Sequence, residues 1–490
     1  MPFILGTNSI KDTGYNVDNS LRFNSASADS LTRAASGNGT SNQKFTMSLW
    51  VKKSSNDSAA RRLIELYNTS SYYISLRFRD DASNRLDFYS ESNGGSVNLR
   101  TNRSFRDTSA WYHIVLAVDT TDSTANDRMK MYINGVQETS FASRTNPGSS
   151  ENLNFNNSGD NQLISISESA SNTENDRKFN GYMSEVCFID GLALAPTSFG
   201  EFDEDSGIWK PIDVSGLTFG NNGFYLETKQ AGTSQNSSGL GADTSGNDNH
   251  FAVNNLTAVD QSTDTCTNNF ATMNPLDNFY GQGTFSEGNL KIAMSDASYA
   301  SLTSTIGVSS GKWYVEIKWT AQTTGTFPAL SWIGIVGSVA TATSMGVGNN
   351  ADSYSYIGDG GDGGKKRNNG SSSSYGDDYA VGDIIGIALD LDNNKIYWSK
   401  NGTFQNSGDP TSGSTGTGSA FNLTTPSSGF YYFAVSDQHD GESSTWQFNF
   451  GSPPFAISSS NADGNGFGNF EYAVPSGYFA LCSKNLAEHG

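Results

Sequence analysis

Cysteine, histidine and basic residues are scarce in this sequence of 490 residues, and each scarcity excludes a class of protein. The three cysteines, Cys187, Cys266 and Cys482, are odd in number and match no zinc-ligand spacing, so neither a disulfide scaffold nor a zinc site is expected. This pattern favours folding in a reducing compartment, with Cys187 buried in an apolar run. The 50 acidic residues outnumber the 30 basic ones, which gives a formal net charge of −20. Nucleic acid is therefore not an expected partner, and polyanions and anionic membranes should be repelled.

Long apolar runs and helical periodicity are also missing. No run approaches the ~18 apolar residues of a membrane-spanning helix, so membrane insertion is not expected. The amino terminus, MPFILGTNSIKDTGY, has no secretory signal pattern, so an extracellular role would need another route out of the cell. The sequence instead has short strand-like runs between Gly-, Ser- and Asn-rich turns, and aromatic residues reach 12%.

The distribution of these runs predicts two domains and a connector. Strand patterns fill residues 1–226, where residues 196–202 predict one helical turn with Pro at its start. Residues 227–286 are poor in large apolar side chains and predict an irregular connector on the surface. Strand patterns return over residues 287–490, and residues 312–319 alternate as in a strand with one buried face. The chain is thus expected to be all-β, with two sandwiches or jelly rolls.

One phrase occurs twice with little identity between its copies. Residues 111–136 read WYHIVLAVDTTDSTANDRMKMYINGV, and residues 384–403 read IIGIALDLDNNKIYWSKNGT. In each copy an apolar run ends in Asp, a polar turn follows, and a second apolar run ends in Asn-Gly. The phrase predicts one antiparallel hairpin in each sandwich, with the Asp accepting backbone bonds in the turn and Asn-Gly supplying positive φ.

The neighbourhoods of the two copies resemble two related families. The first is similar to a laminin-G-like, concanavalin A-type jelly roll, through FTMSLWVK at 45–52, WYHIVLAVD at 111–119, MKMYINGV at 129–136 and FNGYMSEVCFIDGLAL at 179–194. The second is similar to a SPRY domain, through GKWYVEIKW at 311–319, WIGIVG at 332–337, YAVGDIIGIALDLDNNKIYWSKNGT at 379–403 and FYYFAVS at 430–436. The resemblance implies two concanavalin A-like sandwiches, laminin-G-like and then SPRY-like.

The whole layout resembles virion surface proteins of tailed phages, of a type common in marine phages. The supporting phrases are the MPF start, DTSGNDNHFAVNNL at 243–256, ATMNPLDN at 271–278 and PSGYFALCSKNL at 475–486. The resemblance implies a tail fibre, or a capsid fibre or knob, that assembles in the host cytoplasm and is exposed on the virion surface.

This resemblance also implies the partners of the protein. Other virion proteins of the capsid or tail are expected to hold it, and a host-surface glycan or protein is its expected ligand. A homo-oligomer is expected, with the amino-terminal part as the anchor and the SPRY-like part facing outward. Two alternatives stay open: a purely structural decoration that binds only virion proteins, and a bacterial extracellular lectin.

Motifs that suggest metal or phosphate chemistry are incomplete. Residues 390–394 match the first ligand positions of a calcium loop, but Lys395 stands where Gly is required and Asn401 where Glu is required, so a hairpin turn is expected. Residues 358–366, GDGGDGGKK, suggest a phosphate loop, yet their acidic residues would repel phosphate. A solvated loop is expected there, and the alternative is a calcium site built from Asp359, Asp362, Asp377 and Asp378. No metal and no cofactor are therefore expected.

Catalytic motifs are lacking as well. Laminarinase-type members of the concanavalin-like folds need Glu-x-Asp-x-Glu on one strand, and no such string occurs, since Glu185 and Asp190 lie five residues apart. No motif ties a Ser or Cys nucleophile to any of the scattered histidines, which are His113, His250, His439 and His489. No enzymatic activity is expected.

Tyrosines within polar loops are the candidate recognition residues. Flat aromatic faces beside Asp, Asn and backbone donors are typical of sugar-binding sites. Tyr72 and Tyr73 follow a polar turn, and SPRY-type domains present a loop-built binding face at one end of the sandwich. The predicted ligand-binding face comprises the loops that carry Tyr354, Tyr356, Asp359, Tyr375, Asp377 and Tyr379. The alternative is that these tyrosines cap an edge of the sandwich.

Overall fold

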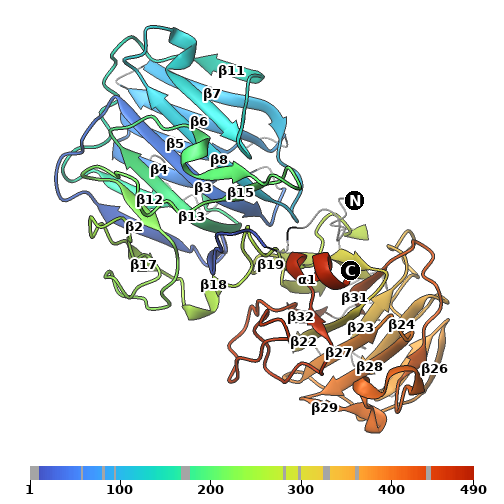
Figure 1. The fold of residues 1–490 in the computed structure, drawn as a ribbon. Coiled ribbons are helices and arrows are strands. Elements are labelled where there is room, and N and C mark those ends of the chain that lie inside the picture. The colour runs from blue at the N-terminus through green and yellow to red at the C-terminus, as the bar shows by residue number, and fades with distance from the viewer. Residues whose placement is uncertain are drawn as a thin grey trace. The chain divides into compact units, whose positions relative to one another are not determined.

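The computed structural model consists of two compact units, Asp12–Thr267 and a second that contains Asn268–Gly490 (Figure 1). Both units are sandwiches of mainly antiparallel sheets, which confirms the predicted all-β class. None of the helices in the part of the chain described is long and apolar enough to cross a membrane. The described residues are 10, 12–56, 59–79, 83–92, 95–166, 177–279, 283–295, 300–323, 331–358, 363–437 and 443–490.

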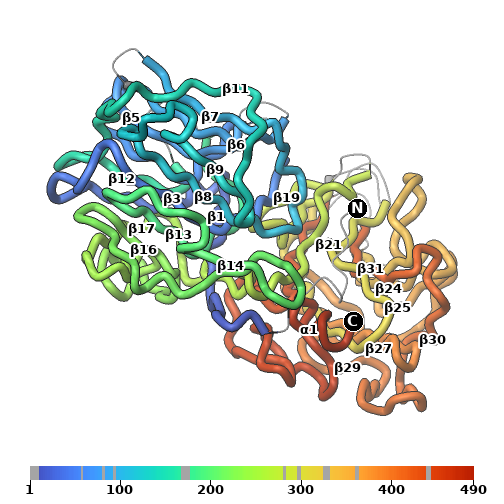
Figure 2. The backbone as a smooth tube through the Cα atoms, turned by 45° about the horizontal axis from the view of Figure 1, so that its top comes forward, coloured from blue at the N-terminus to red at the C-terminus, as the bar shows by residue number. Residues whose placement is uncertain are grey.

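The amino-terminal unit has two large sheets, called here sheet A and sheet B. Sheet A has the order β10 (Val136–Gln137), β9 (Met129–Ile133), β8 (Trp111–Asp119), β3 (Lys44–Lys53), β13 (Gly181–Asp190), β1 (Ser20–Phe23) and β18 (Gln261–Ser262). The remaining strand of sheet A, β16 (Phe224–Leu226), pairs with β13 and lies beside it (Figure 2). Sheet B has the order β11 (Phe141–Thr145), β7 (Gly95–Ser104), β6 (Arg85–Ser92), β5 (Tyr72–Phe78), β4 (Arg61–Thr69), β12 (Asn161–Ile164), β2 (Ser30–Ala34) and β17 (Ala252–Asn254).

The core of this unit lies between the inner faces of sheets A and B. In β3 the alternate residues Phe45, Met47, Leu49 and Val51 are fully buried, as the period of two in the sequence predicts. Their neighbours on the strand point to the outer face of sheet A, so each strand of the sheet presents one set of side chains to each face.

The outer face of sheet A is covered by the chain itself. The hairpin of β14 (Gly200–Phe202) and β15 (Trp209–Pro211) follows a single 3-10 turn at Pro196–Ser198, which confirms the predicted helical turn with Pro at its start. Phe199 and Val214 pack in a buried cluster with Cys187 of β13. Cys187 is therefore buried, as predicted, and the thiols of all three cysteines are free.

Residues 227–267 differ from the connector that the sequence predicts. They belong to the amino-terminal unit, where β17 pairs with β2 and β18 pairs with β1. Only a few large apolar residues occur there, but Leu240, Phe251 and Leu256 all enter the core between the sheets. A low average hydrophobicity hides this role, because burial depends on where each side chain lies and not on the mean of the segment.

The carboxy-terminal unit has one nine-stranded and one six-stranded sheet. The nine-stranded sheet has the order β19 (Gly283–Ser286), β20 (Lys291–Ser295), β32 (Ser443–Asn449), β22 (Lys312–Gln322), β27 (Ile384–Asp390), β28 (Lys395–Lys400) and β29 (Thr403–Phe404), with β30 (Phe421–Asn422) on β28 and β33 (Phe479–Ala480) on β22. The six-stranded sheet has the order β21 (Leu302–Val308), β31 (Tyr431–Asp437), β23 (Ser331–Val336), β24 (Ser353–Gly358), β25 (Lys365–Asn368) and β26 (Ser371–Ser374).

Both faces of β22 are buried, although its alternation predicts only one buried face. Trp313 and Ile317 lie in the core between the sheets, as predicted. The opposite face holds Glu316, which is fully buried and accepts hydrogen bonds from the backbone N–H groups of Glu471 (3.0 Å) and Tyr472 (2.8 Å). The carboxy-terminal segment, which ends in α1 (Ser483–His489), thus covers the outer face of this sheet.

The repeated phrase forms the same hairpin in both units. β8 pairs with β9 and β27 pairs with β28, both antiparallel, as predicted. Asn134 and Asn401 both have positive φ, 49° and 48°, and each is followed by a glycine that also has positive φ. Each Asn accepts a backbone N–H with its side-chain oxygen, from His113 at 2.7 Å and from Ile384 at 2.9 Å. The two copies of the phrase therefore form the same hairpin and the same turn, although few of their residues are identical.

Candidate functional site

The predicted tyrosine face of the carboxy-terminal unit does not lie on the surface. Tyr354, Tyr356, Tyr375 and Tyr379 are 2%, 0%, 7% and 0% exposed and belong to the core. The hydroxyl of Tyr379 donates to the carbonyl oxygens of Ser331 (2.9 Å) and Tyr356 (3.1 Å). The expectation that these rings are exposed is therefore wrong. Alternation in β24 turns Tyr354 and Tyr356 inward, and polar neighbours in the sequence do not reveal that direction.

The acidic candidates of the same region differ from the tyrosines in exposure, although the Tyr356 hydroxyl donates to the carbonyl oxygen of Asp377. Asp377 and Asp378 are exposed, whereas Asp359 and Asp362 lie outside the described residues. Asp390 is fully buried, pairs with Lys312 (3.0 Å) and accepts the backbone N–H of Asn393 (3.0 Å), as expected of a hairpin turn. Within the described ranges, no group of three or more His, Cys, Asp or Glu side chains could hold a metal ion.

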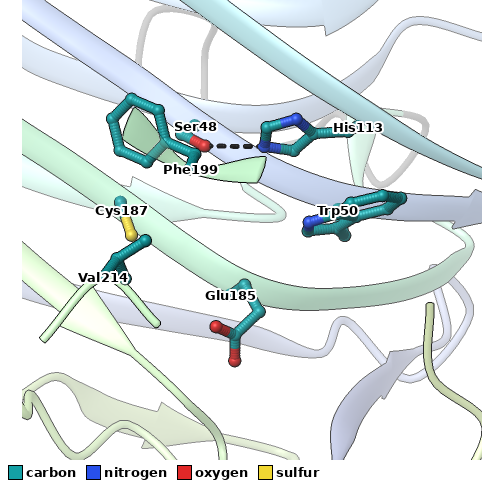
Figure 3. Close-up of a pocket in the computed structure, with 7 residues that line it drawn as sticks. All are labelled: Ser48, Trp50, His113, Glu185, Cys187, Phe199 and Val214. Atoms are coloured by element: carbon teal, nitrogen blue, oxygen red, sulfur yellow. Dashed lines mark hydrogen bonds between the residues drawn. The ribbon is translucent and has the colours of Figure 1, made fainter. Parts of the chain in front are cut away.

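A small cavity lies between sheet A and the segment that covers it. Its volume is about 10 Å³, enough for about one water molecule. Seven residues line it, and Figure 3 shows them: Ser48, Trp50, His113, Glu185, Cys187, Phe199 and Val214. The combination of Ser, His and Glu in one cavity suggests nucleophilic catalysis, so the orientation of the histidine decides what the cavity can do.

The hydrogen bonds of His113 exclude it as a base for Ser48. The indole Nε1–H of Trp209 donates to Nδ1 of His113 at 3.0 Å, because indole nitrogen is only a donor. Burial lowers the pKa of His113 to about 3, so the ring is neutral and its one proton lies on Nε2. Nε2 is 2.9 Å from Oγ of Ser48 and donates to it. The ring therefore has no free lone pair for the serine proton, and the pair is structural.

Glu185 is the strained residue of this cavity. It has a φ of 52° at a bulge in β13, where the register with β3 shifts between Ser184 and Cys187. Its carboxylate accepts hydrogen bonds from the hydroxyls of Tyr225 and Tyr15. Burial raises the pKa of Glu185 to about 7, and burial also raises the pKa of Tyr225. The neighbours of this carboxyl are hydroxyls, so it is stabilised by hydrogen bonds more than by opposite charge.

The outer face of sheet B carries an ordered set of polar and aromatic side chains. Its strand register aligns them in three rows across the sheet. The first row contains Arg62, Arg77, Asp87 and Arg100; the second contains Glu65, Ser75, Tyr89 and Asn98; the third contains Tyr67, Tyr73, Glu91 and Ser96.

Three half-buried tyrosines cross the middle of this face. The ring centroids of Tyr67 and Tyr73 are 6.4 Å apart, and those of Tyr73 and Tyr89 are 5.8 Å apart. The guanidinium of Arg77 lies over the Tyr89 ring, 5.0 Å from its centroid. Burial, together with a hydrogen bond to Glu91, raises the pKa of Tyr89 to about 12, so the hydroxyl is neutral at physiological pH. These three tyrosines, Tyr67 and Tyr73 of the third row and Tyr89 of the second, are called here the tyrosine row, and they combine flat apolar rings with polar neighbours.

Sequence reasoning missed most of this face. Tyr73 was a candidate because it follows a polar turn, and it does lie on this face. The available signal was the alternation in YYISLRF (72–78) and RLDFYSES (85–92), where every second residue is charged, aromatic or small and polar. In RRLIELYNT (61–69) the alternation holds only from Glu65 to Tyr67, because the register shifts between Arg62 and Ile64. Alternation predicts which residues share a face, but the register between strands aligns them into rows, and the register is a tertiary property.

Comparison with known families agrees with this architecture. The model of the Concanavalin A-like lectin/glucanases superfamily, Laminin_G_3, matches residues 24–196, and the SPRY domain model matches residues 312–450. The chain carries a concanavalin A-like domain and a SPRY domain. Both resemblances read from the sequence are confirmed at this level, and the tyrosine row lies within the concanavalin A-like domain.

Solved structures give distant likenesses. The SPRY domain of human HERC1 is 15% identical, covers 36% of this chain and 96% of its own, and has a TM-score of 0.28. The heptameric SAP-like pentraxin from Limulus polyphemus is 14% identical, covers 37% and 80%, and has a TM-score of 0.27. Domain 4 of AbnA, a GH43 extracellular arabinanase from Geobacillus stearothermophilus solved with arabinotriose, is 21% identical, covers 32% and 64%, and has a TM-score of 0.24. The search of curated proteins found no match.

Proposed function

We propose that this protein binds carbohydrate through the outer face of sheet B, without catalysis, and that this binding attaches a tailed-phage virion to its host. The tyrosine row is the observation that carries the binding part. Sugars pack their apolar faces on aromatic rings and use charged and amide side chains at the edge for specificity. Tyr73 lies between Tyr67 and Tyr89, and Glu91, Ser96 and Asn98 of the same two rows supply such groups.

The spacing of carboxylates on this face argues against glycoside hydrolysis. Asp87 and Glu91 lie on the same strand and face, four residues apart, which is about 13 Å along a strand. Retaining hydrolases need about 5 Å between their two carboxyl groups and inverting ones at most about 9.5 Å. Asp87 is also fully buried between arginines, so it is poorly placed to donate or accept a substrate proton.

A glycan array tests the binding part directly. The full-length chain and Tyr73→Ala are compared, with Tyr72→Ala as the matched control, because Tyr72 is the adjacent half-buried tyrosine on the other side of β5. Loss of one stacking ring should lower affinity for the bound glycan about tenfold or more, whereas the control should bind like the unchanged chain. Equal binding by Tyr73→Ala, or no glycan bound at all, would overturn the proposal.

The attachment part rests on the sequence resemblance to virion proteins. We propose a homo-oligomer held by capsid or tail proteins, in which many copies supply avidity to weak sites. Labelled full-length chain should bind susceptible host cells saturably and resistant cells weakly. A structural decoration, the alternative, predicts tight binding to a capsid or tail protein and none to cells. A bacterial lectin predicts the chain outside bacteria with no virion present.

A further inference from the structure

The carboxylate of Asp87 accepts hydrogen bonds from two arginines, and in each arginine the donor is Nε. Its Oδ2 accepts from Nε of Arg77 at 3.0 Å, and its Oδ1 accepts from Nε of Arg100 at 3.1 Å. The three residues face one another directly across β5, β6 and β7. The Asp87 side chain is fully buried, whereas those of Arg77 and Arg100 are 10% and 24% exposed. The carboxylate therefore lies beneath two arginines whose outer ends reach toward solvent.

The remaining donors of these two arginines bind no other group among the residues that the structure describes. Across the described part of the chain, the Nη atoms of Arg77 and Arg100 have no hydrogen-bond partner. A guanidinium that is held through Nε keeps both Nη groups in one plane and free to donate, and such a planar fork matches a carboxylate or sulfate. Orienting the two arginines in advance reduces the entropy that an anion would otherwise lose on ordering them.

The charge around Asp87 is positive in a chain whose net charge is −20. Arg79 adds a third guanidinium at 3.9 Å from Asp87. Asp87 carries one negative charge against the two positive charges of Arg77 and Arg100, so this group keeps a net positive charge that attracts anions although the molecule as a whole repels them. Arginine is concentrated in the amino-terminal part of the chain, since Arg367 is the only arginine that follows Arg177 in the sequence.

We propose that Arg77 and Arg100 form a fork that binds an anionic substituent, a carboxylate or a sulfate, on a sugar whose ring lies over Tyr73. This inference rests on the proposed carbohydrate binding and specifies the class of sugar. The Tyr89 ring is already covered by Arg77, so Tyr73 and Tyr67 supply the stacking surface and the fork supplies charge selectivity.

The test compares neutral, uronate-bearing and sulfated oligosaccharides, immobilised as one array, for binding to the full-length chain. Arg100→Gln removes one arm of the fork but leaves Asp87 paired with Arg77, and Arg100→Lys keeps the charge without the planar donors. Arg103→Gln is the matched control, because Arg103 lies on the same strand and also pairs through Nε, with Glu138 at 2.9 Å. Urea unfolding of each variant verifies that the fold is kept.

The proposal predicts a preference for anionic glycans that Arg100→Gln lowers about tenfold or more, Arg100→Lys lowers partly and Arg103→Gln leaves within about twofold. Binding should weaken as salt rises in the unchanged chain and less so in Arg100→Gln. The uronate and sulfate arms identify which anion is bound. Equal binding of neutral and anionic glycans would overturn the fork but keep the proposed function. Binding of no glycan in any arm would overturn both.

Discussion

The outer faces of sheets A and B use buried charge in opposite ways. On sheet A, Asp264 accepts from Nζ of Lys52 at 2.7 Å and from Nε1 of Trp111 at 3.1 Å, and both members of the ion pair are 1% exposed. On sheet B, Asp87 is equally buried, but its partners Arg77 and Arg100 are 10% and 24% exposed, and their Nη groups have no hydrogen-bond partner among the described residues. The covered face of sheet A satisfies its charges internally. The face of sheet B is open only in part, since Glu65 and Ser75 are fully buried, but its partly exposed arginines keep donors for a ligand.

The largest expected loss of stability comes from breaking the buried ion pair of Lys52 and Asp264 on sheet A. Asp264→Asn removes the carboxylate that lies 2.7 Å from the buried Lys52 ammonium, and it should lower the free energy of unfolding by about 3–5 kcal/mol. Equilibrium unfolding in urea at pH 7 measures it. Lys44 and Asp119 form a surface pair at 2.9 Å, so Asp119→Asn is the control and should cost less than about 1 kcal/mol. If Asp264→Asn and Asp119→Asn lowered the free energy of unfolding equally, the ion pair of Lys52 and Asp264 would not be enclosed as described.

Glu185 tests the covered face through pH. Its folded pKa of about 7 lies above the unfolded value of 4.5, so folding favours the protonated form. The free energy of unfolding should fall as pH rises from about 4.5 to about 7 and then stay constant. Glu185→Gln removes this loss and should be more stable than the unchanged chain by about 3 kcal/mol at pH 8, with little difference at pH 4.

His113 shifts in the other direction, because its folded pKa of about 3 lies below 6.5, and stability is lost as pH falls between those values. The titration of His113 contributes equally to the Glu185→Gln variant and to the unchanged chain. The difference between their free energies of unfolding therefore reports the carboxyl group of Glu185 alone. A difference that does not change between pH 4 and pH 8 would contradict the raised pKa.

The open face should tolerate loss of its carboxylate better. Asp87→Asn releases Arg77 and Arg100, whose guanidiniums can turn toward water, so we expect a loss of about 1–2 kcal/mol, clearly less than for Asp264→Asn. The same urea experiment ranks the two variants. If Asp87→Asn costs as much as Asp264→Asn, the arginines are as enclosed as Lys52 and the contrast between the faces fails.

The smallest effect concerns the cavity histidine. Trp209→Phe removes the donor to Nδ1 of His113 and should cost about 1 kcal/mol. Nitrogen NMR of the ring should show the proton on Nε2 in the unchanged chain. A proton on Nδ1 would instead leave Nε2 free to accept from Ser48 and would reopen the catalytic interpretation of the cavity.

The two units also differ in how well their sites could be predicted. The sequence located both hairpins, and the positive φ at Asn134 and Asn401 follows from the Asn-Gly pairs. The same reasoning failed for Tyr354 and Tyr356, because the loop-like composition around them was taken as a sign of exposure. It singled out Tyr73 but not Tyr89 of the proposed binding face, since Tyr89 joins Tyr73 only when β5 and β6 are aligned.

Local patterns alone determined the fold class, the paired hairpins, the inward set of β3 and the turn at Pro196, because these depend on the period of two and on the φ preferences of Asn, Gly and Pro. Tertiary structure decided which outer faces stay open, since the covering segments are distant in sequence from the strands they cover. It also decided the tautomer of His113 and the fork of Arg77 and Arg100 over Asp87. Each of these depends on the register of neighbouring strands, and side chains on separate strands meet only when that register is set.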